Sequence, residues 1–185
     1  MFGILKSMSE KPPQGPVEEK LDTEKSPLKE AYKLLDAKTP LELSEKYTAH
    51  EQISFKDKTW DYDAPEQIQN VVKNILESIG EDSLDEDERE WRNEILWFWY
   101  HHAISVAGWK RDKEKQKEFS EMALRFQGDN PNILTKTMYL LLHNQVGDAE
   151  KWVASNEGDT DHETAAEMLS NYKTFGSLWA EEGVK

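Results

Sequence analysis

Large apolar residues form one uninterrupted run in the middle of a chain that is otherwise strongly polar. The run occupies residues 95–100 and reads Ile-Leu-Trp-Phe-Trp-Tyr. A helix that carries these side chains is apolar on every side, and such a helix is typically buried all round by other helices. The run therefore predicts the central helix of the fold.

Helix boundaries are marked on both sides of this run. A capping box pairs an oxygen-bearing N-cap with an acid three residues later, and matching segments begin at Thr39, Asp63, Ser83 and Thr160. Ser26-Pro27 and Asn130-Pro131 indicate two further helix starts, because proline is favoured in the first helical turn. Glycines at 80, 128, 147 and 158 separate neighbouring helical patterns. The expected helices span about 27–37, 40–49, 64–79, 84–110, 113–127, 131–145, 148–156 and 161–175.

The pattern predicts an all-α protein of seven or eight helices. Residues 50–62 alternate weakly between polar and apolar, but they have no strand to pair with. We interpret them as a loop that places Phe55, Trp60 and Tyr62 on the core. Residues 1–25 are rich in proline and charge and are expected to form a flexible leader, which leaves 26–185 as a single helical domain.

Two consecutive helix pairs have turn and capping residues at the spacing expected of a helical repeat. Gln127-Gly128-Asp129-Asn130-Pro131 closes one pair, and Gly147-Asp148 forms the turn inside the next. Over residues 95–156 this arrangement resembles the tetratricopeptide repeat, a helix–turn–helix unit of about 34 residues. Phe119 and Phe126 stand where that family usually has alanine. A short tetratricopeptide-like array and an irregular helical bundle are therefore both retained.

Charge and composition exclude several classes of partner. The chain has 37 acidic and 23 basic residues, a net charge of −14, and no cysteine. Nucleic acids and anionic membranes attract basic surfaces, so neither is expected as a partner. Disulfides, thiolate catalysis and cysteine-based zinc sites are excluded. With no signal peptide and no long apolar span, we expect a cytoplasmic protein.

Candidate chemistry is sparse. His101 and His102 follow the aromatic run, and Glu94 shares a helical face with His101. Adjacent histidines point about 100° apart on a helix, and paired Glu-x-x-His motifs are missing. Neither a nucleophile elbow nor a phosphate-binding glycine loop is present. No cofactor is expected, and the protein is interpreted as non-enzymatic.

The predicted function is that of an adaptor or scaffold that binds a protein or peptide between helix pairs. If the repeat resemblance holds, the first helix of each pair lines a shared concave face. The candidate partner-binding residues on that face are His102, Trp109, Tyr139 and His143, with Lys110, Arg111 and Lys113 at a basic rim suited to an acidic partner segment. In a competing interpretation Trp109 and Tyr139 belong to the core. The alternative function is a bundle that binds a small ligand or metal through His101, His102 and Glu94.

Overall fold

The computed structural model describes residues 26–179, and the predicted leader at 1–25 lies outside the described residues. The regular secondary structure of the described part is all helical, with no strands. Its elements are α1 (Lys29–Leu35), α2 (Pro40–Lys56), α3 (Ile68–Ser78), the 3₁₀ turn η1 (Glu81–Ser83), α4 (Glu86–Trp109), α5 (Lys113–Gln127), α6 (Ile133–Leu142), α7 (Val146–Ser155) and α8 (His162–Phe175). The prediction of an all-α fold with seven or eight helices is confirmed.

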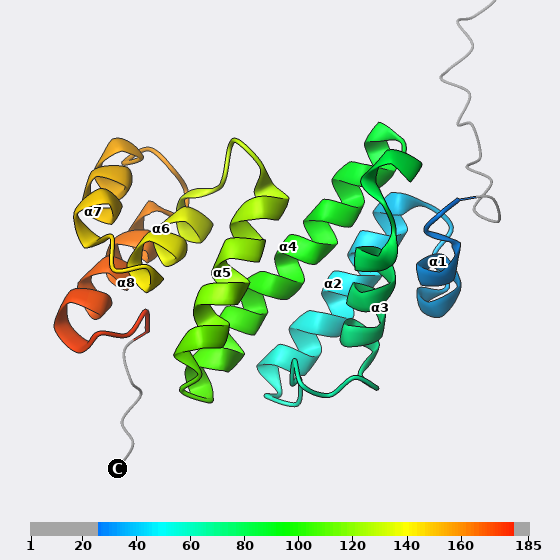
Figure 1. Cartoon of the computed structure of the whole chain (residues 1–185), viewed down its shortest axis with the longest axis horizontal. Coiled ribbons are helices and arrows are strands. Elements are labelled where there is room, and N and C mark those ends of the chain that lie inside the picture. The colour runs from blue at the N-terminus through cyan, green and yellow to red at the C-terminus, as the bar shows by residue number, and fades with distance from the viewer. Residues whose placement is uncertain (1–25, 180–185) are drawn as a thin grey trace, which may run out of the picture.

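The helices are arranged in a row, with α1 at one end and α7 and α8 at the other (Figure 1). In the middle, α4 packs against α5, α2 and α3, while α6 packs against α5, α7 and α8. The helix carrying residues 95–100 is therefore central, as predicted. The α4–α5 and α6–α7 pairs are consecutive helical hairpins. Their resemblance to tetratricopeptide repeats stays a prediction.

Side-chain caps fix several of the helix starts. The side chains of Thr39, Asp112 and Asn132 accept hydrogen bonds from backbone N–H groups in the first turns of α2, α5 and α6. The capping box of α4 is formed by Asp85 and Glu88, two residues later than the predicted box at Ser83. Ser83 instead ends η1, because its hydroxyl donates back to the carbonyl of Gly80.

The prediction of a loop over residues 50–62 was wrong for residues 50–56, which extend α2. Buried positions in α2 fall at Leu43, Tyr47 and Glu51, which is helical spacing. In this part of α2 the acidic Glu51 is buried, whereas the apolar Ile53 is 63% exposed. The usual pattern of apolar residues on the buried side is therefore reversed, and the sequence does not show the helix. The loop proper begins after Lys56. Trp60 is buried, and Phe55 and Tyr62 pack partly against the core as expected.

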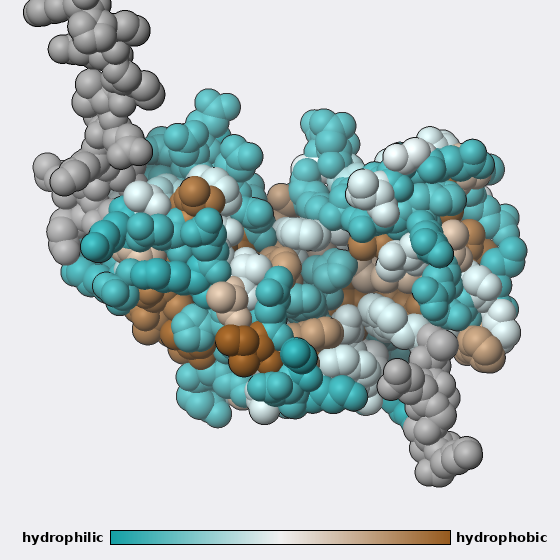
Figure 2. Space-filling model, turned by 180° about the vertical axis from the view of Figure 1, so that it is seen from behind, coloured by the Kyte–Doolittle hydropathy of each residue, from teal (hydrophilic) through white to brown (hydrophobic). Residues whose placement is uncertain are grey.

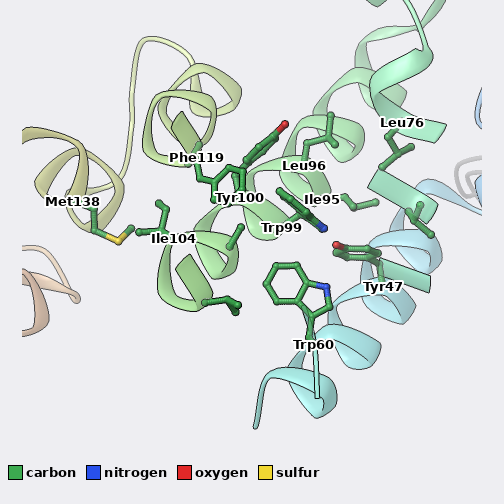
Figure 3. Close-up of a cluster of buried hydrophobic side chains, with 14 of the residues drawn as sticks. Tyr47, Trp60, Leu76, Ile95, Leu96, Trp99, Tyr100, Ile104, Phe119 and Met138 are labelled. Atoms are coloured by element: carbon green, nitrogen blue, oxygen red, sulfur yellow. The ribbon is translucent and has the colours of Figure 1, made fainter. Parts of the chain in front are cut away.

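One face of α4 supplies the centre of the core (Figure 3). Ile95, Leu96 and Trp99 are almost fully buried there. The indole N–H of Trp99 donates to Asn70 Oδ1 at 2.9 Å, and its ring meets Trp60 edge-on at 5.5 Å. Burial on every side was nevertheless the wrong inference for α4. Trp97 and Phe98 remain partly exposed, which leaves a second, open face on this helix.

Candidate docking groove along helix α4

The open face of α4 carries a line of partly exposed aromatic side chains. Trp91, Trp97, Phe98 and His101 lie at helical spacing on this side, with the exposed Glu94 among them. Residues three and four apart share a helix face, so these side chains form one continuous surface. We call it the α4 stripe. It runs beside the face that fills the core.

The C-terminal part of the α4 stripe, from Trp97 to His101, is held in place by neighbouring side chains. The indole N–H of Trp97 donates to Thr135 Oγ1 on α6 at 2.9 Å. Trp97 also lies 6.0 Å from Phe98 and 5.6 Å from His101, measured between ring centroids. A surface whose side chains are already ordered loses less conformational entropy when a partner binds.

Two hollows flank the stripe near the start of α4, each with a volume of about 460 Å³. The first lies between α4 and the α5–α6 junction, and it is lined by Glu90, Trp91, Asn93, Glu94, Trp97, Phe126, Gln127 and Asn132. The second lies between α4 and α2, and it is lined by Leu41, Ser44, Glu45, Thr48, Ala49, Gln52, Trp91 and Glu94. Trp91 and Glu94 line both hollows and so form the ridge between them.

Viewed from behind, the molecule is hollowed across its middle, where pale and brown side chains gather between hydrophilic margins (Figure 2). Apolar side chains of α2 also remain exposed: Leu41 is 49% and Ile53 is 63% exposed. The hollows are acidic as well as aromatic. Glu45, Glu90 and Glu94 line them, and neither lining includes a lysine or an arginine.

A buried polar pair joins α2 to α4 next to the stripe. Glu51 on α2 is fully buried, and its Oε1 lies 3.2 Å from Nδ1 of His102. Burial raises the pKa of the Glu51 carboxyl, and the neighbouring His102 opposes this shift in part. The His102 ring stacks on Phe55 with centroids 4.4 Å apart. This pair fixes the position of His102 and leaves it little freedom to contact a partner.

His101 is the histidine that belongs to the open face. Burial, with a smaller contribution from the neighbouring His102, lowers its pKa to about 4. Its imidazole is therefore neutral at pH 7, and the stripe carries no positive charge from this residue.

The first group of predicted partner-binding residues lies at the far end of α4. Trp109 is 49% exposed and tilts against Phe55 at 5.0 Å. Lys110 forms ion pairs with Asp61 and Asp63, and its Nζ lies 2.5 and 2.9 Å from their carboxylate oxygens. Although partial burial opposes protonation of Lys110, these hydrogen bonds raise its pKa overall. Arg111, with a left-handed backbone (φ 60°), and Lys113 are exposed at the turn into α5.

The second group lies at the C-terminal end of α6, with His143 as the C-cap residue. Tyr139 and His143 tilt against each other with ring centroids 4.4 Å apart, and His143 Nε2 lies 3.4 Å from Glu121 on α5. Between described residues, no hydrogen bond, ion pair or ring contact joins this group to Trp109 or His102. Tyr139 packs partly against the core, whereas Trp109 is exposed.

The residues of the alternative metal site are not gathered into a ligand cluster. Within residues 26–179, no group of three or more His, Asp or Glu residues is placed to hold a metal ion. The rings of His101 and His102 lie 5.7 Å apart, and Glu94 accepts a hydrogen bond from Ser44 at 3.2 Å.

Trp91 was missed as a site residue, although its spacing could have revealed it. Positions 91, 94, 98 and 101 repeat at intervals of three and four, and they form a second stripe parallel to the core-facing one. Apolar residues all round α4 predict complete burial, and this prediction hides the second stripe as open surface.

None of the helices described is both long enough and apolar enough to cross a membrane. No protein-family model, curated protein or solved structure matches the chain.

Proposed function

We propose that this protein is a helical interaction domain that binds a short segment of a partner protein along the α4 stripe. The observation that carries the proposal is the presence of Trp91, Trp97 and Phe98 on a partly exposed face of α4, beside the face that fills the core. Tryptophan is among the residues that contribute most to binding energy at protein interfaces.

The two hollows support this proposal through their shape. They lie on either side of the ridge formed by Trp91 and Glu94, so a bound segment would insert one side chain into each. Amphipathic segments commonly bind in this way, with a few apolar anchors placed in a groove between helices. The role proposed is binding without a chemical step.

Site-specific crosslinking tests the proposed function. A photoreactive amino acid at Gln52, which is exposed and lines one hollow, would form covalent adducts with partner proteins in native lysate. The same group at Asn74, which is exposed on α3 and lines neither hollow, serves as the matched control. The adducts at Gln52 should disappear when Trp91→Ala is added. Adducts that form equally at both positions, or that persist in Trp91→Ala, would place binding elsewhere.

A further inference from the structure

We infer that the partner segment is basic as well as apolar, with one or more lysines or arginines between two large apolar side chains. The inference rests on the proposed function and specifies the chemistry of the segment that binds there. It is carried by an arrangement of aromatic rings and carboxylates that binds a lysine or arginine of this chain at several places but is left without one, among the described residues, at the α4 stripe.

The first internal case is Lys110. Its ammonium group lies 4.3 Å from the ring centroid of Tyr62 and forms ion pairs with Asp61 and Asp63. The second case is Lys73, which lies 4.9 Å from the Trp99 ring and 2.6 Å from a carboxylate oxygen of Glu77. In both cases one cation contacts an aromatic face and a carboxylate together, which combines cation–π and ionic attraction.

The α4 stripe presents the same groups without the cation. Trp91 shares the lining of both hollows with Glu94, and Glu90 lines one of them. No lysine or arginine of the described residues lies over the Trp91 ring or forms an ion pair with Glu45, Glu90 or Glu94. A lysine or arginine from a partner would supply that cation. Its apolar neighbours would enter the hollows beside Trp97 and Leu41.

The charge of the molecule favours the same partner. Three carboxylates line the hollows, and the whole chain carries a net charge of −14, so an acidic segment would be repelled at short range. A second copy of this chain would bring the same negative charge. The predicted basic rim offers less positive charge to an acidic segment, because its Lys110 already pairs with two aspartates of this chain.

Selection from a displayed library of random peptides tests this inference on the full chain. Wild type should enrich peptides that combine large apolar residues with lysine or arginine. Trp91→Ala should not enrich them, whereas Trp109→Ala, with its altered tryptophan at the other end of α4, should enrich them as wild type does. Trp91 is not part of the apolar core, so Trp91→Ala is expected to fold.

Calorimetric titration of the enriched peptides then isolates the charge. Glu90→Gln/Glu94→Gln should weaken binding by about tenfold, which is the size expected from two partly exposed ion pairs, and added salt should weaken wild-type binding. Enrichment of acidic or neutral peptides, or unchanged affinity in the double variant, would overturn the inference but leave the groove in place. If no peptide is enriched, the proposed function fails and the inference fails with it. Peptides enriched only after removal of residues 1–25, or self-association in sedimentation experiments, would assign the groove to this chain itself.

Discussion

At the scale of single residues, the molecule depends on polar groups that are buried in pairs across helices. Glu51 and His102 are 51 positions apart in the chain but 3.2 Å apart in space. An acid inside a helix is ordinarily solvated, so the sequence alone gave no reason to expect Glu51 to be fully buried. The pairing depends on how α2 crosses α4, and local pattern carries no information about that crossing.

A variant that lacks the imidazole of His102 but keeps the stacked ring should show how much an unpaired, buried Glu51 carboxylate lowers the free energy of unfolding. His102→Phe retains an aromatic ring against Phe55 but leaves Glu51 without its partner, so we expect a loss of about 3 kcal/mol in the free energy of unfolding near pH 7. Urea titration measures it. The loss should shrink at acidic pH, where Glu51 takes up a proton, and in combination with Glu51→Gln. A loss independent of both would mean that His102 acts through packing alone.

His101 should make stability depend on pH in a defined direction. Its pKa of about 4 in the folded protein lies below the ordinary value of 6.5, so the unfolded chain binds this proton first. Stability is therefore expected to fall as the pH drops from about 6.5 to about 4, by up to about 3 kcal/mol from this residue. Glu51, whose pKa is raised, instead increases the stability of the folded state as the pH falls. It does so equally in wild type and in His101→Gln. Urea unfolding of wild type and His101→Gln across this range isolates the difference, and parallel curves would contradict the assignment.

At the scale of the helices, the sequence was most informative where caps and spacing agreed. The start of α2 at Pro40 and both ends of α5 agree with the helix spans predicted from the sequence. Predictions failed where tertiary contacts decided the outcome. Helix α2 continues to Lys56 because its buried side packs on α4. Helix α4 begins after Asp85, where the Glu88 carboxylate accepts hydrogen bonds from the Asp85 backbone N–H and from the Ser26 hydroxyl.

The start of α4 gives a graded test of these contacts. Asp85→Ala removes one cap and should cost about 1 kcal/mol in unfolding free energy, like Thr39→Ala at the start of α2. Glu88→Ala should cost more, about 2 to 3 kcal/mol, because Glu88 also accepts a hydrogen bond from the buried Ser26 hydroxyl. Chemical denaturation compares the three variants. Equal losses for Asp85→Ala and Glu88→Ala would contradict a role for Glu88 beyond the cap.

At the scale of the whole molecule, residues 95–100 correctly identified the central helix but not its surroundings. Neighbouring helices cover the side of Leu96 and Trp99, and a groove leaves the side of Trp91 and Trp97 open. The candidate residues on α4 and α6 follow from a repeat pattern, and such a pattern predicts a helix face but not which side chains on it already pair within the protein. Lys110 and His102 have such internal partners.

The two faces of α4 should respond differently to truncation. Trp99→Ala removes a buried ring that contacts Trp60, and should cost about 3 to 5 kcal/mol. Trp91→Ala should cost less than about 1 kcal/mol, because that ring lies outside the core cluster. Urea unfolding of both variants gives the comparison. If Trp91→Ala were as destabilising as Trp99→Ala, the α4 stripe would be structural.

The most direct test of the central claim is the set of indole N–H signals in the NMR spectrum of ¹⁵N-tryptophan-labelled full chain. The seven tryptophans report on separate places: Trp91 and Trp97 on the stripe, Trp60 and Trp99 on the core, Trp109 on the far end of α4, and Trp152 and Trp179 on the C-terminal part. Addition of an enriched basic peptide should shift the signals of Trp91 and Trp97 and leave those of Trp60, Trp99 and Trp152 in place. Shifts confined to Trp109, Trp152 or Trp179, with Trp91 and Trp97 unchanged, would contradict the assignment of the α4 stripe as the binding surface.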